Sequence, residues 1–129
     1  MRAEILKLPD GVYEFEDFLD DDGIGTESIR ICCRLTIDGD IVVADFEKSD
    51  SQVSGPVNAT FGVTASQVYT VLFQMTDPEM PSNHGAFRPI KILAPPGSVV
   101  NANYPAACFG GNVETSSRIM DVLLGCFLQ

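Results

Sequence analysis

The clearest pattern along the chain is a strict alternation of apolar and polar positions between residues 29 and 37. A two-residue period of this kind is typical of a β-strand with one face against a core. Asp38-Gly39-Asp40 follows with the residues of a tight turn, and residues 41–46 form a second apolar run. The pattern therefore predicts a β-hairpin. The inward positions of its first strand are Ile29, Ile31, Cys33, Leu35 and Ile37.

A shorter alternation around Tyr13 and Phe15 predicts an earlier strand, which we expect to end in the acidic turn Asp20-Asp21-Asp22-Gly23. Two further short strands are expected, over residues 88–93 and around Val99, because a turn rich in proline and glycine separates two apolar runs there. These strands would extend the hairpin into a sheet.

Two later stretches have the period of amphipathic helices. The first begins at Thr64 and is expected to end near Asp77-Pro78, and the second occupies the last part of the chain, with Asn112 or Thr115 as its N-cap. The apolar positions are Ala65, Val68, Tyr69, Leu72 and Phe73 in the first helix and Ile119, Val122, Leu123, Cys126 and Phe127 in the second.

Together the patterns predict an α+β fold, a sheet containing a β-hairpin with two amphipathic helices, in a single domain over residues 1–129. Residues 48–60, rich in Ser, Asp, Gly and Pro, are expected to form a loop. The last helix carries its apolar stripe to Gln129 with no polar tail. We therefore expect the sequence to be an excised part of a larger subunit.

Charge is distributed unevenly between the two parts of the chain. The first 50 residues hold 14 acidic and five basic side chains, whereas the last 79 hold four and three. A segment with so few charges is expected to be covered by other protein in its natural setting. The net charge of −10 argues against a nucleic-acid partner, because phosphate contacts need clustered Lys and Arg.

Neither a membrane span nor a signal peptide is visible, so we expect a cytoplasmic protein. The four cysteines have no zinc-ligand spacing and lie in apolar stretches, where reduced structural thiols are expected. The acidic run is not an EF-hand loop, because Ile29 stands where the loop needs a glutamate. No residues suggest a metal site, and no glycine-rich phosphate loop is present.

Two polar clusters are candidates for a substrate site, although no catalytic residue can be assigned. The first combines an amide, an imidazole and a guanidinium in a short loop, and the second opens the last helix, where free N–H groups favour anions. The structural alternative is capping and loop scaffolding, with Glu114 and Arg118 as a surface ion pair. The substrate-binding candidates are Asn83, His84 and Arg88 in the first cluster and Asn112, Glu114, Ser116 and Arg118 in the second.

Both clusters belong to a series of short motifs spread along most of the chain. The motifs are Asp20-Asp21-Asp22-Gly23, residues 37–40 with 45–46, residues 51–52 with 55–58, residues 83–90, residues 96–101 and residues 111–121. In this order they resemble the hydantoinase B and 5-oxoprolinase family, which includes the acetone and acetophenone carboxylase subunits. Each motif alone is short, but the series of six is specific.

The resemblance implies a parent subunit several times longer than this chain, whose metal-binding region has no counterpart here. It implies ATP-dependent opening of a cyclic amide such as a hydantoin or 5-oxoproline, or alternatively ATP-dependent carboxylation of a ketone. A divalent metal and ATP would serve the parent, with ATP held by a companion A-type subunit. The fragment itself would hold no cofactor, and its partners would be the rest of its subunit, the A-type subunit and a small-molecule substrate.

Two hypotheses from other classes stay open. The chain could be a non-catalytic binding or interaction domain, which would also bury the charge-poor segment. It could also be a free-standing cysteine hydrolase that pairs His84 with one of the four cysteines, but a reactive thiol needs an exposed electropositive setting.

Overall fold

The computed structural model describes residues 1–129 and contains a four-stranded mixed sheet in the order β1-β2-β3-β4. The β1–β2 and β2–β3 pairs are antiparallel, and β4 lies parallel to β3. The two-residue turn between β2 and β3 contains Gly39 at φ 57°, a backbone conformation that a side chain rarely adopts. The strands are β1 (Gly11–Asp21), β2 (Glu27–Asp38), β3 (Ile41–Asp45) and β4 (Ile90–Leu93).

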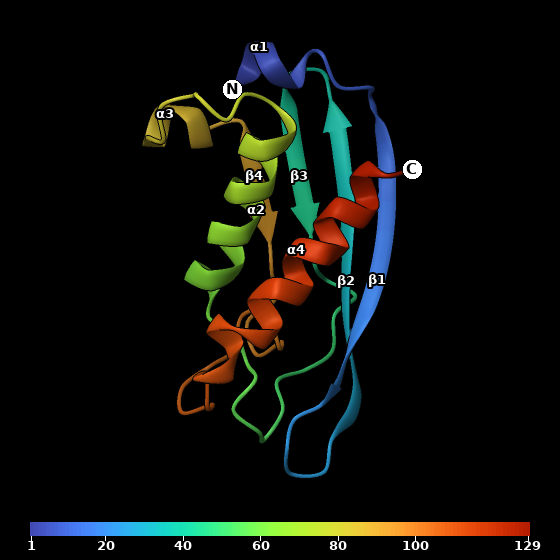
Figure 1. Cartoon of the computed structure of the whole chain (residues 1–129), viewed down its shortest axis with the longest axis vertical. Coiled ribbons are helices and arrows are strands. Elements are labelled where there is room, and N and C mark those ends of the chain that lie inside the picture. The colour runs from blue at the N-terminus through green and yellow to red at the C-terminus, as the bar shows by residue number, and fades with distance from the viewer.

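Two long helices cover one face of this sheet (Figure 1). Helix α4 crosses β1 and β2, and helix α2 packs beside it and against β4. None of the helices combines the length and apolar character needed to span a lipid bilayer. The helices are α1 (Arg2–Ile5), α2 (Phe61–Met75), α3 (His84–Phe87) and α4 (Glu114–Phe127), with a 3-10 turn at Gly110–Asn112.

A single hydrophobic core of 22 buried residues fills the space between the sheet and these helices. Residues 29, 31, 33, 35 and 37 of β2 all point into it, and each has 3% or less of its surface exposed. Helix α4 can approach β1 closely because Gly125 faces the ring of Phe15, where a side chain on residue 125 would overlap that ring. The alternation in β2 therefore decides which face of the sheet the helices cover.

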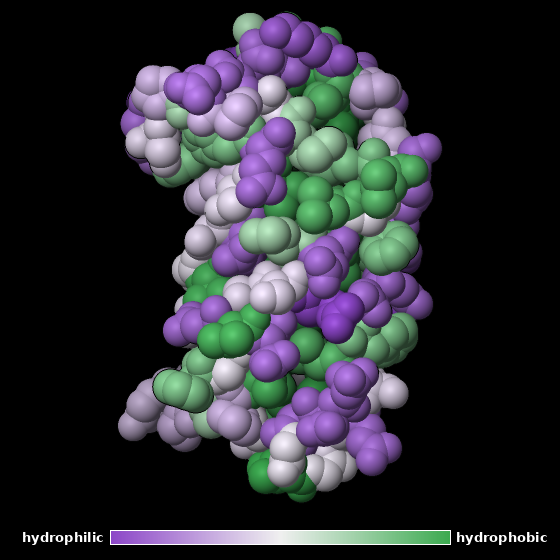
Figure 2. All heavy atoms as spheres, in the orientation of Figure 1, coloured by the Kyte–Doolittle hydropathy of each residue, from purple (hydrophilic) through white to green (hydrophobic).

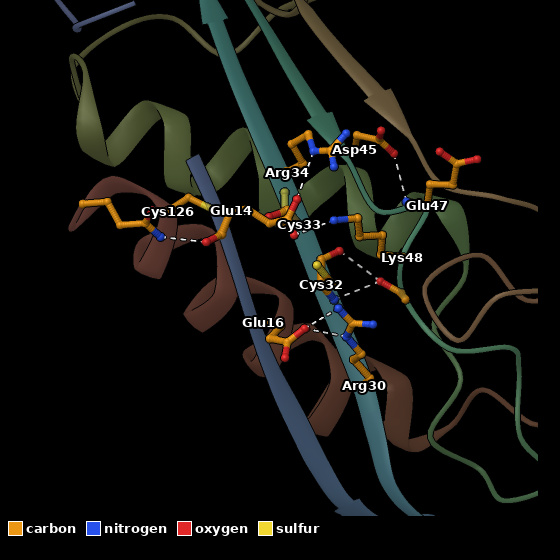
Figure 3. Close-up of polar contacts among 12 residues, drawn as sticks. Glu14, Glu16, Arg30, Cys32, Cys33, Arg34, Asp45, Glu47, Lys48 and Cys126 are labelled. Carbon is orange, nitrogen blue, oxygen red and sulfur yellow. Dashed lines mark hydrogen bonds and ion pairs between the residues drawn. The ribbon is translucent and has the colours of Figure 1, made fainter. Parts of the chain in front are cut away.

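The opposite face of the sheet carries ion pairs, as Figure 3 shows. Glu14 accepts from Arg34 at 3.0 Å and from Lys48 at 2.6 Å, and Glu16 accepts from Arg30 Nε at 2.6 Å. The hydrogen bond from Lys48, followed by that from Arg34, lowers the pKa of Glu14 below its ordinary value. These pairs lie in solvent-accessible positions, so they serve the solubility of this face more than its stability.

The predicted α+β fold, the hairpin and both long helices are confirmed, but four details were wrong. Strand β1 continues through Asp21, because this acidic segment still pairs with Glu27 of β2. Helix α2 begins at Phe61 instead of Thr64, and no strand forms around Val99, where only isolated bridges occur. Two short helices, α1 and α3, had no detectable period because each is only four residues long.

Candidate functional site

The buried side chain of Asn58 holds two loops together, the loop of residues 53–58 and the segment around Ala107. Its Nδ2 group donates to the carbonyl oxygens of Val53 at 2.9 Å, Gly55 at 3.1 Å and Ala107 at 2.9 Å, and its Oδ1 accepts from the Val53 N–H at 2.8 Å. Asn58 has no exposed surface. Because every polar atom of the amide has a partner, its burial is compensated.

A second buried polar residue, Asp22, joins the β1–β2 connection to the same loop. Its carboxylate accepts N–H groups from Thr26 at 2.9 Å, Ile24 at 3.0 Å and Gly55 at 3.0 Å. These hydrogen bonds, that of Thr26 foremost, lower the pKa of Asp22 from its ordinary 3.8 to about 2. Asp22 is thus a permanently charged structural residue at neutral pH.

The start of α4 is fastened to this loop by hydrogen bonds to the carbonyl oxygens of the loop. The Gly110 N–H donates to the carbonyl oxygen of Pro56 at 2.6 Å, and the Thr115 hydroxyl donates to that of Val57. Gly111 lies so close to the carbonyl group of Asn58 that a Cβ on residue 111 would overlap it. The loop of residues 53–58 therefore fixes where α4 begins.

These connections surround a hollow of about 440 Å³ between the acidic turn and the first turns of α4. We name it the end pocket. Glu114 and Arg118 are the two predicted site residues that line it, together with three aspartates of the acidic turn. The pocket residues are Leu19, Asp20, Asp21, Asp22, Gly23, Pro56, Val57, Gly110, Glu114 and Arg118.

Arg118 is the one basic group of the end pocket and is already paired with carboxylates. Its Nη1 donates to Asp17 of β1 and lies 3.8 Å from Asp121, while its buried Nε makes no hydrogen bond. The pKa of Asp17 is lowered first by the Phe18 N–H and then by Arg118. Because carboxylates outnumber Arg118 in the pocket, its electrostatics favour a cation or a neutral amide over an anion.

The predicted caps of the last helix are not the ones that form. Helix α4 follows Val113 with no side-chain cap, and the hydroxyl of Thr115 bonds to Val57 instead. The predicted ion pair between Glu114 and Arg118 is also wrong, because Asp17 on the neighbouring strand takes that guanidinium. Ser116 is buried and donates to the Asn112 carbonyl oxygen at 2.8 Å, a bond within the helix start.

The other predicted cluster lies at the opposite end of the molecule, on α3 (Figure 1). Asn83 caps this short helix by accepting the Ala86 N–H at 3.1 Å, which agrees with the scaffolding alternative. His84 and Arg88 are exposed there. Within this chain the two clusters do not form one site. If both bind substrate, each must do so at a separate place, together with residues of other protein.

The residues of the end pocket do not fit a divalent metal ion. No group of three or more His, Cys, Asp or Glu side chains converges anywhere in the chain. The carboxylate oxygens of Asp22 already accept hydrogen bonds from three N–H groups, and the only histidine is on α3. We therefore derive no chemical step that passes through a metal in this domain.

Sequence reasoning missed Asn58 and Asp22 as the buried polar residues that hold the loops around the end pocket together. Both residues lie in motifs that the sequence shows. The sequence alone, however, does not distinguish a buried asparagine from any other loop asparagine, or Asp22 from Asp20 and Asp21. Glycines at 55 and 111, each within a motif, were the available signal of close backbone approach.

The comparisons with known proteins extend over all of these residues. The model of the Hydantoinase B/oxoprolinase family matches residues 1–129. The chain belongs to this family. Among hydantoinase B/oxoprolinase relatives, the 5-oxoprolinase of Dictyostelium discoideum is 38% identical over 113 residues, which cover 86% of this chain and 8% of the relative. The B-type subunit of a putative D-/L-hydantoinase from Pseudomonas sp. is 31% identical, covering 100% of this chain and 24% of the relative.

A solved family structure has the same fold. The ATP-dependent caprolactamase of Pseudomonas jessenii matches with a TM-score of 0.77 and 26% identity over 97% of this chain and 22% of that chain. The chain thus spans less than a quarter of the length of each of these three proteins. It corresponds to a part of larger hydantoinase-like proteins.

Replacing Asp22 with Asn should lower the melting temperature at pH 7 by several degrees, because Asn cannot offer a charged oxygen to all three N–H groups. The stability that Asp22 contributes is present above its unfolded pKa and is lost as pH falls from about 4 toward 2. The difference between wild type and D22N should therefore shrink over that range. Thermal melts at pH 7, 5, 4, 3 and 2 measure it, with the exposed neighbour variant Asp20→Asn as control; equal effects of both variants would contradict this role.

Gly111→Ala should destabilise the fold by about 3 kcal/mol or more, because the new methyl group overlaps backbone that Asn58 holds in place. Gly62→Ala in α2 is the matched control, since its Cβ would meet only the Thr60 hydroxyl at 3.9 Å. It should raise stability by about 0.5–1 kcal/mol. Urea unfolding of both variants measures the contrast, and a mild effect at Gly111 would refute the close approach.

Proposed function

We propose that this chain is part of an ATP-dependent enzyme that opens a cyclic amide, such as a hydantoin or 5-oxoproline, and that the chain alone is inactive. Family membership over the full chain is the observation that carries the proposal. The named relatives share one chemistry, because 5-oxoproline, hydantoins and caprolactam are all cyclic amides. Hydrolysis of a ring amide is therefore the reaction that the comparisons favour.

The proposed role of the domain is to support the active site of the parent enzyme and to form part of the wall of its pocket. Its polar side chains at the end pocket are mostly engaged within the chain, as the three hydrogen bonds of Asp22 and the pairing of Arg118 with Asp17 show. A parent enzyme of this type would use ATP and a divalent metal, and these would be held by other parts of the subunit or by an A-type companion. A cytoplasmic location belongs to the same proposal.

The substrate-binding role of the two clusters is kept as a prediction. Arg118, at the end pocket, and Arg88, exposed on α3, are the groups that would meet negative charge on an activated intermediate. Asn83 and Asn112 would orient its carbonyl or amide groups. Arg118 would first have to exchange Asp17 for the substrate, and the excess of carboxylates in the end pocket opposes an anion there. Arg88 is therefore the less constrained of the two arginines.

The proposed partners are the remainder of the same subunit and an A-type subunit. A strongly exposed apolar group on the loop before α4 supports contact with other protein: Tyr104 is 98%, Phe109 is 88% and Val113 is 61% exposed. The segment that bears them is also the charge-poor part of the chain. We propose that this loop is covered in the assembled enzyme.

A piece of an ATP-dependent ketone carboxylase is the alternative, because a shared fold does not distinguish the two reactions. A non-catalytic interaction domain is the other alternative, and the exposed apolar loop would fit it equally well. The reaction products distinguish the cyclic amide hydrolase from the ketone carboxylase. If the chain is a non-catalytic interaction domain, variants of the candidate site residues should not change turnover.

The first experiment measures ATP hydrolysis and ring opening with hydantoin, 5-oxoproline and caprolactam, in the presence of a divalent metal. It is run on this chain alone and on the intact subunit with its A-type companion. We expect activity only in the assembly. Activity of the isolated chain would overturn the fragment proposal, and bicarbonate-dependent carboxylation of a ketone without ring opening would favour the carboxylase.

In the intact enzyme, Arg88→Ala and Arg118→Ala should each lower turnover by roughly tenfold or more. Arg2→Ala is the control, since Arg2 also forms a surface ion pair, with Asp40, but lies outside both clusters. Asp17→Ala separates the two roles of Arg118: a structural pair would make the D17A and R118A effects similar, whereas a substrate contact would make R118A far worse. Unchanged turnover in folded R88A and R118A variants would end the site hypothesis.

A further inference from the structure

Strand β4 forms one edge of the sheet, with β3 on one side and no strand on the other. The carbonyl oxygen of Pro89, just before β4, accepts the Val42 N–H at 2.9 Å, and that of Leu93 accepts the Phe46 N–H at 2.8 Å. The backbone groups of successive strand residues point to alternate sides of the strand. Those of Leu93 therefore face β3, and the N–H and C=O groups of Ile92 point to the free outer edge.

A hollow of about 430 Å³ follows this outer edge, and we name it the edge groove. Both Ile92 and Leu93 line it. Because consecutive strand residues place their side chains on opposite faces of the sheet, a hollow lined by both passes around the edge from one face to the other. The other lining residues are Asp45, Glu47, Phe61, Ala94 and Pro95.

The side of the molecule that bears β4 is recessed. In Figure 1, β4 lies behind α2 at the left of the sheet, with α3 above and the loop before α4 below. In the same view, Figure 2 shows that the outline of the molecule is narrowed on this side between those two parts. The loop below carries the exposed Tyr104 and Phe109. The free edge thus lies on the same side as the loop that is proposed to be covered by other protein.

The two sides of the edge groove differ in chemistry. On the helix side, Phe61 is 45% exposed next to Ile92. On the open face of the sheet, the carboxylates of Asp45 and Glu47 lie beside β4 (Figure 3). Neither forms an ion pair, because the neighbouring cations of Arg34 and Lys48 bind Glu14 instead. A complementary strand would be apolar toward the helices and basic toward the open face.

We propose that a strand from the remainder of the same subunit pairs with β4 and extends this sheet to five strands. Its backbone bonds to the outward N–H and C=O groups of Ile92, and its side chains alternate between an apolar residue against Phe61 and a basic residue near Asp45 and Glu47. The inference rests on the proposed function in one respect, that this chain is part of a longer subunit.

The size of the edge favours a strand of the same subunit over a separate molecule. Strand β4 is only four residues long, and pairing along it buries far less than the roughly 1,000 Å² that a stable interface between two molecules needs. A tethered segment has a high effective concentration and needs less contact area. The curated relatives and the solved structure are more than four times as long as this chain, so such a segment has ample chain to come from.

Hydrogen exchange of the Ile92 amide tests the pairing directly, with no variant needed. Measured residue by residue in a mass spectrometer, this amide should exchange about 100-fold or more slowly in the intact subunit than in the isolated chain. The Leu93 amide is the internal control, because its bond to β3 protects it in both.

Proline substitution provides a second test. Ile92→Pro removes only an outward N–H, so the isolated variant should melt within about 3 °C of Ile92→Ala, whereas Leu93→Pro should lower the melting temperature far more. In the intact subunit, Ile92→Pro should melt about 3 °C or more below Ile92→Ala, because the added strand loses a hydrogen bond.

Equal exchange of the Ile92 amide in the isolated chain and in the intact subunit would overturn the proposal. Protection that rises with the concentration of the isolated chain, together with dimers in analytical ultracentrifugation, would overturn it in favour of a second copy. Protection that appears only after the A-type subunit is added would place the strand in that partner instead. None of these measurements uses ATP or a cyclic amide, so their failure is distinct from failure of the proposed reaction.

Discussion

The position of α4 depends on one fully buried amide, that of Asn58. This side chain binds the backbone of its own loop and that of residue 107 just before the helix, so the loop and the helix start behave as one unit. Glycines at 55 and 111 make the arrangement possible, since a side chain at either would overlap backbone that the hydrogen bonds hold in place. Because this unit fixes the start of α4, the end of the helix with Gly125 and Cys126 lies against β1 and β2. Helix α4 then covers one face of the sheet.

The same unit explains why three of the six family motifs lie together in space. The acidic turn, the loop of residues 53–58 and the first turns of α4 are far apart in the sequence and enclose the end pocket. Their polar atoms mostly satisfy one another, through Asp22 with Gly55 and Thr115 with Val57. These contacts give the motifs a structural role, and the proposed substrate role of Arg118 would come in addition to it.

Electrostatics divide the molecule by face and by end. The uncovered face of the sheet carries balanced ion pairs around Glu14 and Glu16, while the end pocket has an excess of carboxylates. The loop before α4, by contrast, presents Tyr104 and Phe109 to solvent. Under the proposal that this chain is part of a larger enzyme, the exposed apolar loop is the surface that other protein covers.

The sequence by itself determined the hairpin, both long helices, the α+β class and the family, because periodicity and short motifs are local properties. It could not reveal that Asn58 and Asp22 are buried, that Arg118 pairs with Asp17 instead of Glu114, or that the α3 cluster lies far from the start of α4 (Figure 1). Those outcomes depend on how β1, the loop and α4 come together in three dimensions. The contact between Cys33 and Cys126 belongs to the same class: two apolar stretches predicted two buried thiols, and only the packing of α4 on β2 placed them side by side.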